Sequence, residues 1–334
     1  MQATVLERIA PIEESPLRLE VRPVPEPCDG EVLLKVRCCG ICRTDLHVIE
    51  GELPRQKLPI IPGHQVVGIV EALGPGCKRL AQGQRIGAAW LRHTCGTCVF
   101  CNAGQENLCE ASRFTGYHAD GGYAEYAVVP EDYAYIIPDA FDDVEAAPLL
   151  CAGIIGYRAL KRANLPSGGT LAIFGFGSSA HVVFQIAKHR GATVYVVSRG
   201  GKHLELAREM GADWVSDRVE DMPQKVDSAI IFAPAGHLVP PALETVRKGG
   251  TLALAGVYMT DVPAMNYEKH LFYERDLRSV TANCRQDGRE LLAEAAEIPI
   301  RPHTTTYPLA EANRALQDLK ADQINGSGVL VVEA

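Results

Sequence analysis

The spacing of apolar and polar positions changes near residue 150 of this 334-residue chain. Before that point, short runs rich in β-branched residues alternate with glycine-rich turn clusters such as 73–76 and 120–122. These runs predict strands at 31–36, 65–73 and 122–129. The first part of the chain is therefore predicted to be an all-β domain of barrel or sandwich type.

From about residue 152, apolar runs alternate with segments of helical spacing. The predicted strands are 170–174, 193–197, 228–232 and 251–255, and the predicted helices are 180–189 and 202–210. Apolar strands separated by helices are typical of a parallel, doubly wound sheet of the Rossmann type, in the α/β class.

The segment from about residue 284 is predicted to carry one helix, 310–320, and a last strand, 329–332. We expect it to pack back on the first domain. The predicted organisation is one domain of residues 1–151 and 284–334 and a second domain of residues 152–283.

Composition and charge narrow the possible partners. A formal net charge of −8 disfavours a nucleic-acid partner. No apolar stretch approaches the roughly 18 residues of a membrane span, and the N-terminus lacks the basic and apolar regions of a secretory signal. We expect a cytoplasmic protein without a membrane partner. A count of eleven cysteines indicates metal binding or catalysis by some of them rather than disulfides.

Four of these cysteines follow the spacing C-x2-C-x2-C-x7-C, namely Cys95, Cys98, Cys101 and Cys109. Four thiolates this close in sequence can saturate a tetrahedral zinc ion. A disulfide loop would need an oxidising compartment. The bacterial iron–sulfur pattern has a fourth cysteine after three residues, followed by proline, whereas here Cys109 comes after a gap of seven residues and is followed by Glu110. The spacing predicts a structural zinc site.

A dinucleotide-binding motif, G-x-G-x-x-A, lies between the strand at 170–174 and the next helix and includes Gly175, Gly177 and Ser178. The first glycine permits a tight turn and the second lets the backbone approach a pyrophosphate. The helix that follows offers its free N–H groups to the phosphates. The strand–turn–helix context therefore predicts a nucleotide site.

The end of the second strand of that domain indicates which nucleotide binds. Ser198 and Arg199 stand where an acidic residue would hold the ribose of NAD. Serine can donate a hydrogen bond to a 2′-phosphate, and arginine can pair with it. We predict NADP(H), with NAD(H) as the alternative if Arg199 is only a solvated charge.

A second metal site is predicted from Cys42, His64 and Cys151. Two thiolates and one imidazole leave a zinc ion one open position, as in catalytic sites. Asp45 can orient His64, and Thr44 and His47 can relay a proton. We also assign Arg43 to cofactor binding.

With these motifs in order, the chain resembles the zinc-dependent medium-chain alcohol dehydrogenases over essentially its whole length. The segment from Gly116 to Tyr126 resembles the cinnamyl-alcohol-dehydrogenase-like bacterial branch. The resemblance implies a GroES-like β-barrel for the first domain, two zinc ions per subunit, and a homodimer or homotetramer. It also implies that Trp90 lies beside the substrate and that Thr44 and His47 form the relay.

Three positions depart from the family pattern. Gln65 replaces the glutamate that usually follows the zinc histidine, which puts an exchange of zinc ligands in doubt. Ile155 replaces a threonine, so that one expected nicotinamide contact becomes apolar. An arginine expected near the C-terminus is not evident at 325–328.

The predicted activity is reversible oxidation of a small alcohol to an aldehyde or ketone, with a zinc-bound alkoxide and hydride transfer between the alcohol carbon and the nicotinamide. An NAD-dependent alcohol dehydrogenase or a polyol dehydrogenase is the nearest alternative, although the latter often has an acidic residue where this chain has Cys151. A zinc-independent quinone or enone reductase would lack the three ligands. A non-catalytic zinc- and nucleotide-binding protein would not need Thr44 and His47.

Overall fold

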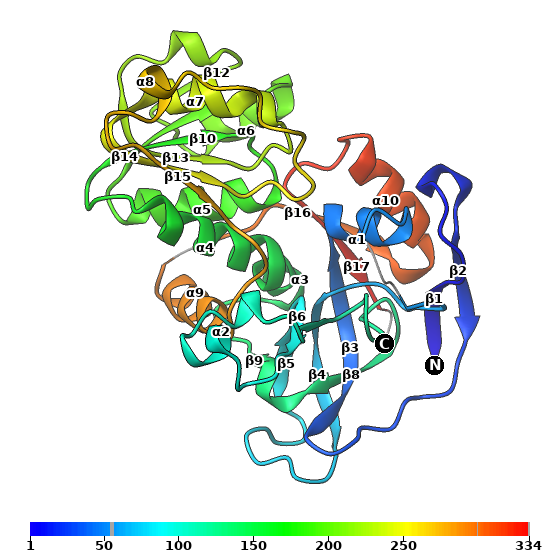
Figure 1. Ribbon diagram of the computed structural model, residues 1–334. Coiled ribbons are helices and arrows are strands. Elements are labelled where there is room, and N and C mark those ends of the chain that lie inside the picture. Colours follow the sequence, from blue (N-terminus) through cyan, green and yellow to red (C-terminus); the bar gives the residue numbers. More distant parts are fainter. Residues whose placement is uncertain (54–56, 299, 333–334) are drawn as a thin grey trace. The chain divides into compact units, whose positions relative to one another are not determined.

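The computed structural model describes residues 1–53, 57–298 and 300–332. The chain divides into two compact units (Figure 1). Unit 1 comprises Met1–Cys151, Ala282–Glu297 and Arg301–Ala334, and unit 2 comprises Ala152–Thr281 and Ile298–Ile300. None of the described helices is both long enough and apolar enough to cross a membrane.

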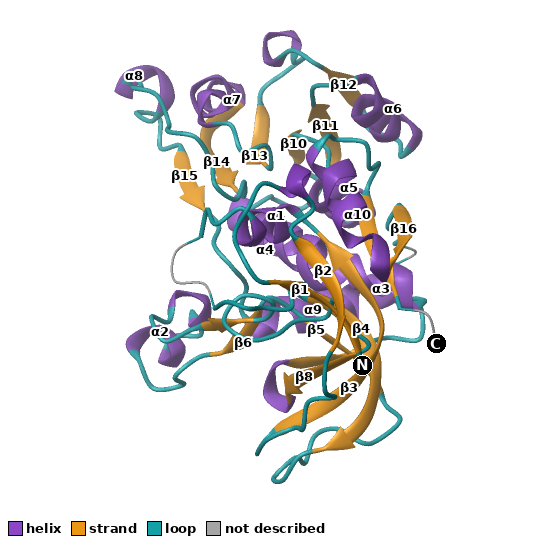
Figure 2. Ribbon diagram, turned by 90° about the vertical axis from the view of Figure 1, so that its right-hand side faces the viewer, coloured by secondary structure: helices purple, strands orange, loops and turns teal. Residues whose placement is uncertain are grey.

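Unit 2 is built on a six-stranded sheet in which every neighbouring pair is parallel. Its strands are β10 (Thr170–Phe174), β11 (Thr193–Val197), β12 (Trp214–Ser216), β13 (Val226–Ile231), β14 (Val246–Leu254) and β15 (Asp276–Ser279). Their spatial order is β12-β11-β10-β13-β14-β15 (Figure 2). Counted from β10, this is the 3-2-1-4-5-6 order of the Rossmann fold. The predicted doubly wound parallel sheet is confirmed.

Helices cover both faces of this sheet. They are α4 (Ile154–Ala163), α5 (Ser178–His189), α6 (Gly201–Glu209), α7 (Val239–Thr245) and α8 (Tyr267–His270), with 3-10 turns η5 (Val219–Asp221) and η6 (Gly236–Leu238). Figure 1 shows α4 and α5 together on one face and α7 on the other. Phe174, Ile231 and Leu243 belong to a buried cluster that joins the sheet to α7.

The strands predicted at 170–174 and 193–197 are confirmed residue for residue. Strand β14 begins five residues earlier than predicted, at Val246. Residues 247–249 are exposed and polar or glycine, so they show no strand-like apolar pattern even though they extend the strand.

Unit 1 contains a seven-stranded sheet in the order β16-β17-β3-β4-β5-β9, with β8 also paired to β3. These strands are β3 (Glu31–Ile41), β4 (Gln65–Leu73), β5 (Arg85–Ala88), β8 (Tyr126–Pro130), β9 (Ala134–Ile136), β16 (Thr304–Pro308) and β17 (Ser327–Val331). Only β16 and β17 are parallel neighbours. Because β17 pairs with β3, the C-terminal segment is part of this sheet.

Smaller elements complete unit 1. Two short sheets pair β1 (Gln2–Leu6) with β2 (Leu17–Val21) and β6 (Leu91–His93) with β7 (Arg113–Phe114). The helices are α1 (Arg43–Ile49), α2 (Val99–Asn102), α3 (Asp143–Pro148), α9 (Arg285–Glu297) and α10 (Ala312–Lys320). The tighter or wider turns are η1 (Ile12–Glu14), η2 (Glu106–Leu108), η3 (Glu131–Tyr133), η7 (Leu309–Glu311) and the π-helical turn η4 (Leu149–Gly153).

The predicted strand at 122–129 is wrong at its start, because β8 begins only at Tyr126. Gly121 packs against the backbone near Gly63 so closely that a Cβ on it would lie 2.0 Å from the carbonyl oxygen of Gly63, and the N–H of Gly122 donates to the same oxygen at 3.0 Å. Close backbone contact replaces strand pairing there. Helix α9 and strand β16 were also not predicted. The mostly polar sequence of α9, with Gly288 inside it, gives a weak helical signal.

Candidate active site

Three side chains predicted as metal ligands meet in unit 1. His64 Nε2 lies 3.4 Å from Cys42 Sγ and 3.3 Å from Cys151 Sγ. The three donor atoms all lie within 4.8 Å of one another. Two sulfurs and one imidazole nitrogen form a donor set that fits a zinc ion with a further coordination position.

Three different elements supply these ligands. Cys42 is the N-cap of α1, directly after β3 ends. His64 precedes β4, and the pairing of Gly40 with Gln65 sets the ends of β3 and β4 side by side. Cys151 lies in the π-helical turn η4, a kind of turn that occurs often at functional sites. The ligands therefore converge through sheet pairing and helix capping.

Asp45 joins two of these ligands from a fully buried position. One of its carboxylate oxygens accepts a hydrogen bond of 2.8 Å from the backbone N–H of Cys42. The other lies 3.1 Å from His64 Nδ1. Asp45 and His64 are each 1% exposed. The carboxylate thus caps α1 and directs Nε2 of His64 toward the two sulfurs.

The ionisable groups of this cluster shift one another's pKa values. A hydrogen bond from the Cys151 thiol lowers the pKa of Cys42 most, and the neighbouring His64 lowers it further. Together they outweigh burial, which raises it, so that the pKa lies well below that of an ordinary thiol. Burial lowers the pKa of His64, but Asp45 and Cys42 outweigh it and raise that pKa to about 10. A cluster that collects a thiolate and a carboxylate in a buried place suits a divalent cation.

The predicted relay residues Thr44 and His47 lie one helical turn apart on α1, and both are partly exposed. The Nδ1 atom of His47 forms an ion pair with the carboxylate of Glu52, whose backbone N–H also donates to the carbonyl of His47. Glu52 was not identified from the sequence. Its only signal is the glycine before it, which is typical of the end of a helix. Arg43, assigned to cofactor binding, is exposed at the first position of α1.

Trp90, predicted to lie beside the substrate, packs edge-on against the imidazole of His64 with 5.0 Å between ring centres. Phe114 and Tyr117 stack on Trp90 at 4.9 and 5.8 Å. These rings, with His118 and Leu53, line a pocket of about 470 Å³. No pattern in the sequence grouped Phe114, Tyr117 and His118 with Trp90.

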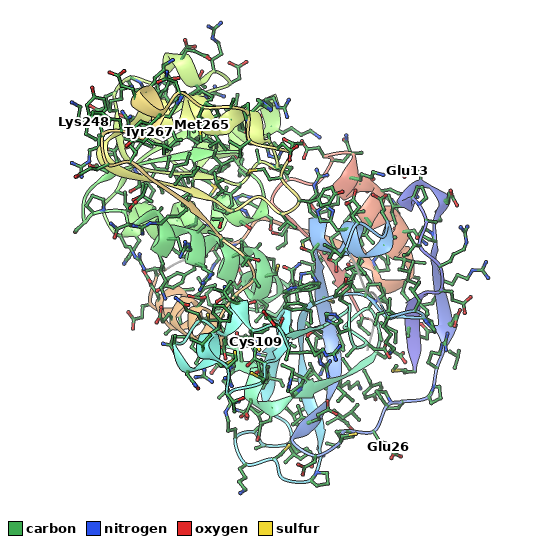
Figure 3. The ribbon with its side chains drawn as sticks, in the orientation of Figure 1. Glu13, Glu26, Cys109, Lys248, Met265 and Tyr267 are labelled. Carbon is green, nitrogen blue, oxygen red and sulfur yellow. The ribbon has the colours of Figure 1, made fainter. Side chains whose placement is uncertain are left out.

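The four cysteines of the loop at 95–109 also converge, with their sulfurs within 4.8 Å of one another. Figure 3 labels Cys109, the last of the four. Backbone N–H groups point at these sulfurs, and those of Thr97 and Cys98 lower the pKa of Cys95 to about 6. Cys98 caps the short helix α2 by accepting from the N–H of Cys101. Four thiol donors in one turn-rich loop fit a closed tetrahedral zinc site.

This cysteine loop is fastened to helix α9 of the same unit. Arg285 donates to both carboxylate oxygens of Glu106 at 2.7–3.1 Å, and its backbone N–H donates to Oε1 as well. The guanidinium also lies 4.6 Å from the ring centre of Tyr133, whose hydroxyl is 2.8 Å from Thr94 Oγ1. A segment far along the chain thus holds the loop, which sequence spacing did not reveal.

The glycine motif of unit 2 forms the expected turn between β10 and α5. Gly175 has a left-handed backbone (φ 87°), and a Cβ there would lie 3.0 Å from the N–H nitrogen of Ala233. A Cβ on Gly177 would meet nothing within 4 Å, so space remains beside this residue. Gly177 caps α5 without a side-chain hydrogen bond, and Ser178 is the first helical residue. Open space and uncapped N–H groups fit the pyrophosphate of a dinucleotide.

The two residues predicted to select the cofactor have different surroundings. Ser198 is 6% exposed, and its hydroxyl lies 3.4 Å from both the backbone nitrogen of Phe176 and the carbonyl oxygen of Arg199. Arg199 itself is exposed, in the loop between β11 and α6. The Arg199 side chain is thus open to solvent, whereas the serine hydroxyl already bonds within the turn.

The structure also shows the surroundings of the positions that depart from the family pattern. Gln65 begins β4 and is 1% exposed, and its side-chain nitrogen has no hydrogen-bond partner among the described residues. Ile155 lies in the first turn of α4 and is partly exposed. At the C-terminus, Ser327 and Gly328 form the start of β17, paired with β16 and β3.

Two family models match the chain. The alcohol dehydrogenase GroES-like domain matches residues 28–139, and the zinc-binding dehydrogenase model matches residues 180–297. Together they cover more than half of the chain. The first match confirms the GroES-like barrel expected for unit 1.

Related proteins match this chain over its full length. A Mycobacterium tuberculosis protein named "Probable alcohol dehydrogenase AdhA" is 48% identical, covering 99% of this chain and 97% of its own length. An alcohol dehydrogenase of Geobacillus stearothermophilus is 37% identical over the whole of both chains. Among solved structures, a cinnamyl alcohol dehydrogenase from Sorghum bicolor is 26% identical with a TM-score of 0.89, covering 99% of this chain and 97% of its own. The chain is therefore a member of the zinc-dependent medium-chain alcohol dehydrogenase family.

Proposed function

We propose that this alcohol dehydrogenase interconverts alcohols and aldehydes with a preference for NADP(H), using a catalytic zinc ion at Cys42, His64 and Cys151 and a structural zinc ion at Cys95, Cys98, Cys101 and Cys109. The observation that carries the proposal is the convergence of His64 Nε2 with two cysteine sulfurs while Asp45 holds the opposite nitrogen of the ring.

Held by Cys42, His64 and Cys151, a zinc ion would supply Lewis acidity to the alcohol or carbonyl oxygen, and a bound nicotinamide would supply or take up hydride. The protein's own side chains orient the metal ligand and transfer the proton. Asp45 fixes the tautomer and direction of His64. Thr44 and His47 share one face of α1 because they are three residues apart, and they pass the proton of the alcohol toward solvent.

The ring system around Trp90 supports aromatic alcohols and aldehydes as substrates. Trp90 links the imidazole of His64 to the stacked side chains of Phe114 and Tyr117. Flat substrates gain from offset stacking on such rings, and the volume of about 470 Å³ falls in the usual range for small-molecule pockets.

The exposed guanidinium of Arg199 and the absence of an acidic residue at the end of β11 support NADP(H). NAD(H) is the second candidate, because the Ser198 hydroxyl already contacts Phe176 and Arg199 within the turn. The family resemblance further implies a homodimer or homotetramer, which light scattering would measure, and we also propose a cytoplasmic location.

The decisive experiment compares kcat/KM for NADPH and NADH, each with benzaldehyde and with a short aliphatic aldehyde. We expect at least about a tenfold preference for NADPH, equivalent to about 1.4 kcal/mol, and for benzaldehyde. An Arg199→Ala variant is the matched control and should lose the preference for NADPH while retaining turnover with NADH. Equal rates with both cofactors would reject the NADP(H) assignment, and no turnover with either would reject the activity.

A further inference from the structure

A tight turn after β7 fixes the side chain of His118 in unit 1. The backbone N–H of His118 donates to the carbonyl of Phe114 at 3.0 Å, and the N–H of Phe114 donates in return to Nδ1 of the imidazole at 3.2 Å. Inside the turn, Thr115 donates from its N–H to the carbonyl of Trp90 and from its hydroxyl to the carbonyl of Ala89. These hydrogen bonds tie the imidazole to β7 and to the segment that carries Trp90.

A glycine in the same turn packs against the residue before the metal ligand His64. Gly116 is left-handed (φ 71°), and a Cβ there would lie 2.8 Å from the backbone nitrogen of Gly63. Backbone thus lies against backbone at this point, with no room for a side chain at position 116. The turn that holds His118 is therefore set in place relative to His64.

The hydrogen bond to Nδ1 determines the tautomer of His118. A backbone N–H can only donate, so Nδ1 is the accepting nitrogen and the proton of the neutral ring is on Nε2. Burial and the positive charge of Arg113 lower the pKa of His118, which favours the neutral ring. Among the described residues, none accepts a hydrogen bond from Nε2. This N–H is therefore available to a ligand.

The imidazole of His118 lines the pocket that also contains Trp90. Trp90 packs against His64 on one side and stacks on Phe114. Phe114 in turn stacks on the imidazole of His118, with 5.5 Å between ring centres, and Tyr117 packs edge-on against it at 4.5 Å. The Nε2 donor thus lies beside aromatic rings, and Trp90 and Phe114 form the series of contacts that joins it to the metal ligand.

Two charged side chains, Glu110 and Arg113, line the same pocket, and both are exposed. Water screens exposed charges, so each contributes little to the binding of a small ligand. His118 is only partly exposed and is covered by two rings, so water competes less for its N–H. The imidazole is therefore the polar group of this pocket that is best placed to discriminate between substrates.

We propose that His118 is a specificity-determining residue whose Nε2–H donates a hydrogen bond to an acceptor oxygen on the ring of an aromatic aldehyde or alcohol, on the side remote from the reacting carbon. The reacting end of such a substrate faces the metal ligands, and its ring lies along Trp90 and Phe114. A substrate without the acceptor is disfavoured, because the donor loses water without gaining another partner. The inference rests on the proposed function, in which this pocket takes the substrate.

The test compares 4-methoxybenzaldehyde with 4-ethylbenzaldehyde, which has nearly the same shape but no acceptor oxygen. The measured quantity is the ratio of their kcat/KM values, because comparing this ratio between proteins cancels the different reactivity of the two aldehydes. We expect the ratio of the zinc-loaded wild type to fall about threefold to tenfold in His118→Phe, which keeps the ring but loses the donor.

Two further variants sharpen this test. His118→Gln keeps a side-chain N–H donor and should retain part of the wild-type ratio. His93→Phe makes the same change at an exposed histidine of β6 and is the matched control, whose ratio should equal that of the wild type. An unchanged ratio in His118→Phe, or an equal decrease in His93→Phe, would overturn the inference. An equal loss of kcat/KM for both aldehydes leaves the ratio unchanged and would show that His118 serves only the fold.

A second measurement does not depend on turnover. The enzyme cannot transfer hydride to 4-methoxybenzamide or 4-ethylbenzamide under these conditions, so calorimetry can measure their Kd values with enzyme that holds zinc and NADPH. We expect the methoxy compound to lose about threefold to tenfold in relative affinity in His118→Phe. Wild-type enzyme that turns over neither aldehyde would reject the proposed function, whereas the amide ratio would still decide the role of His118. Wild-type enzyme that binds neither amide would overturn that role.

Discussion

The two cysteine-containing clusters of unit 1 are built in opposite ways. The loop cluster takes all four donors from residues 95–109, within one turn-rich stretch. The Cys42, His64 and Cys151 cluster draws its donors from a helix cap, a residue before a strand and a π-helical turn, 109 positions apart from first to last. One site is local, and the other exists only when the barrel is folded.

Their supporting residues differ in the same way. In the loop, backbone N–H groups point at the sulfurs, and the Glu106–Arg285 pair holds the loop from outside. At the other cluster, a buried carboxylate orients the one imidazole ligand. Four sulfurs close a tetrahedral metal site, whereas three ligands leave a position for substrate. The difference fits the proposed roles, a structural zinc ion at the loop and a catalytic zinc ion at Cys42, His64 and Cys151.

The variant Cys42→Ala should have the largest effect and tests whether the two metal sites have different roles. Because the variant loses one of three zinc ligands, we expect kcat to fall by about a thousandfold or more. NADPH binding, followed by its fluorescence, should persist, and metal analysis should show the loop zinc retained. Substantial turnover by a Cys42→Ala protein that lacks the catalytic zinc would contradict the assignment.

Cys98→Ala is the matching change in the loop. We expect loss of the loop zinc and a decrease of several kcal/mol in the free energy of unfolding, roughly in line with structural zinc sites. The kcat of the protein that remains folded should stay within about twofold of wild type, since this loop supplies no group to the reaction. Denaturant unfolding and active-site titration would measure the two effects. Abolished kcat in a fully folded variant would show that the sites are not separate.

Asp45→Asn probes the support of the imidazole ligand. Asparagine can still accept from the N–H of Cys42, so α1 should form, but its neutral amide orients His64 less well. We expect zinc affinity at this cluster to fall about 10- to 100-fold, measured by competition with a chelator. The loop zinc of the same protein is the internal control, and an equal loss at both sites would mean that the variant has damaged the fold.

Glu106→Gln should have the smallest effect. It removes a charged acceptor from Arg285, and we expect a loss of about 1–2 kcal/mol in the free energy of unfolding, with faster release of zinc from the loop to a chelating dye. The exposed Glu110→Gln is the control and should change neither quantity. An identical effect of both variants would show that the pairing of Glu106 with Arg285 does not stabilise the loop.

Acid should reproduce this effect in the wild type. Burial raises the pKa of Glu106, but the hydrogen bonds and charge of Arg285 outweigh it and lower that pKa below 4.5. An acid with a depressed pKa in the folded protein contributes stability above its unfolded pKa and loses it as the pH falls through the folded value. The difference in unfolding free energy between wild type and Glu106→Gln should therefore be full at neutral pH, decrease as the pH falls through the usual range of glutamate, and vanish only below the lowered folded-state pKa.

Local patterns were enough for much of the fold. The apolar strands at 170–174 and 193–197 and the glycine turn after the first of them followed from the sequence, because buried parallel strands and tight turns have strong local signals. Polar stretches that are held by tertiary contacts, such as α9 with Gly288 against the ring of Tyr135, did not.

The sequence by itself determined the donor chemistry, since cysteine and histidine at these spacings are suited to zinc wherever they meet. Only the tertiary structure decided which other side chains meet the predicted ones. Arg285 reaches Glu106 across 179 positions of the chain, and Phe114 reaches Trp90 through the pairing of β6 and β7. Glu52 is close in sequence to His47, yet their contact depends on a left-handed glycine packed against Ile9. Such contacts depend on the path of the backbone, which residue spacing alone does not specify.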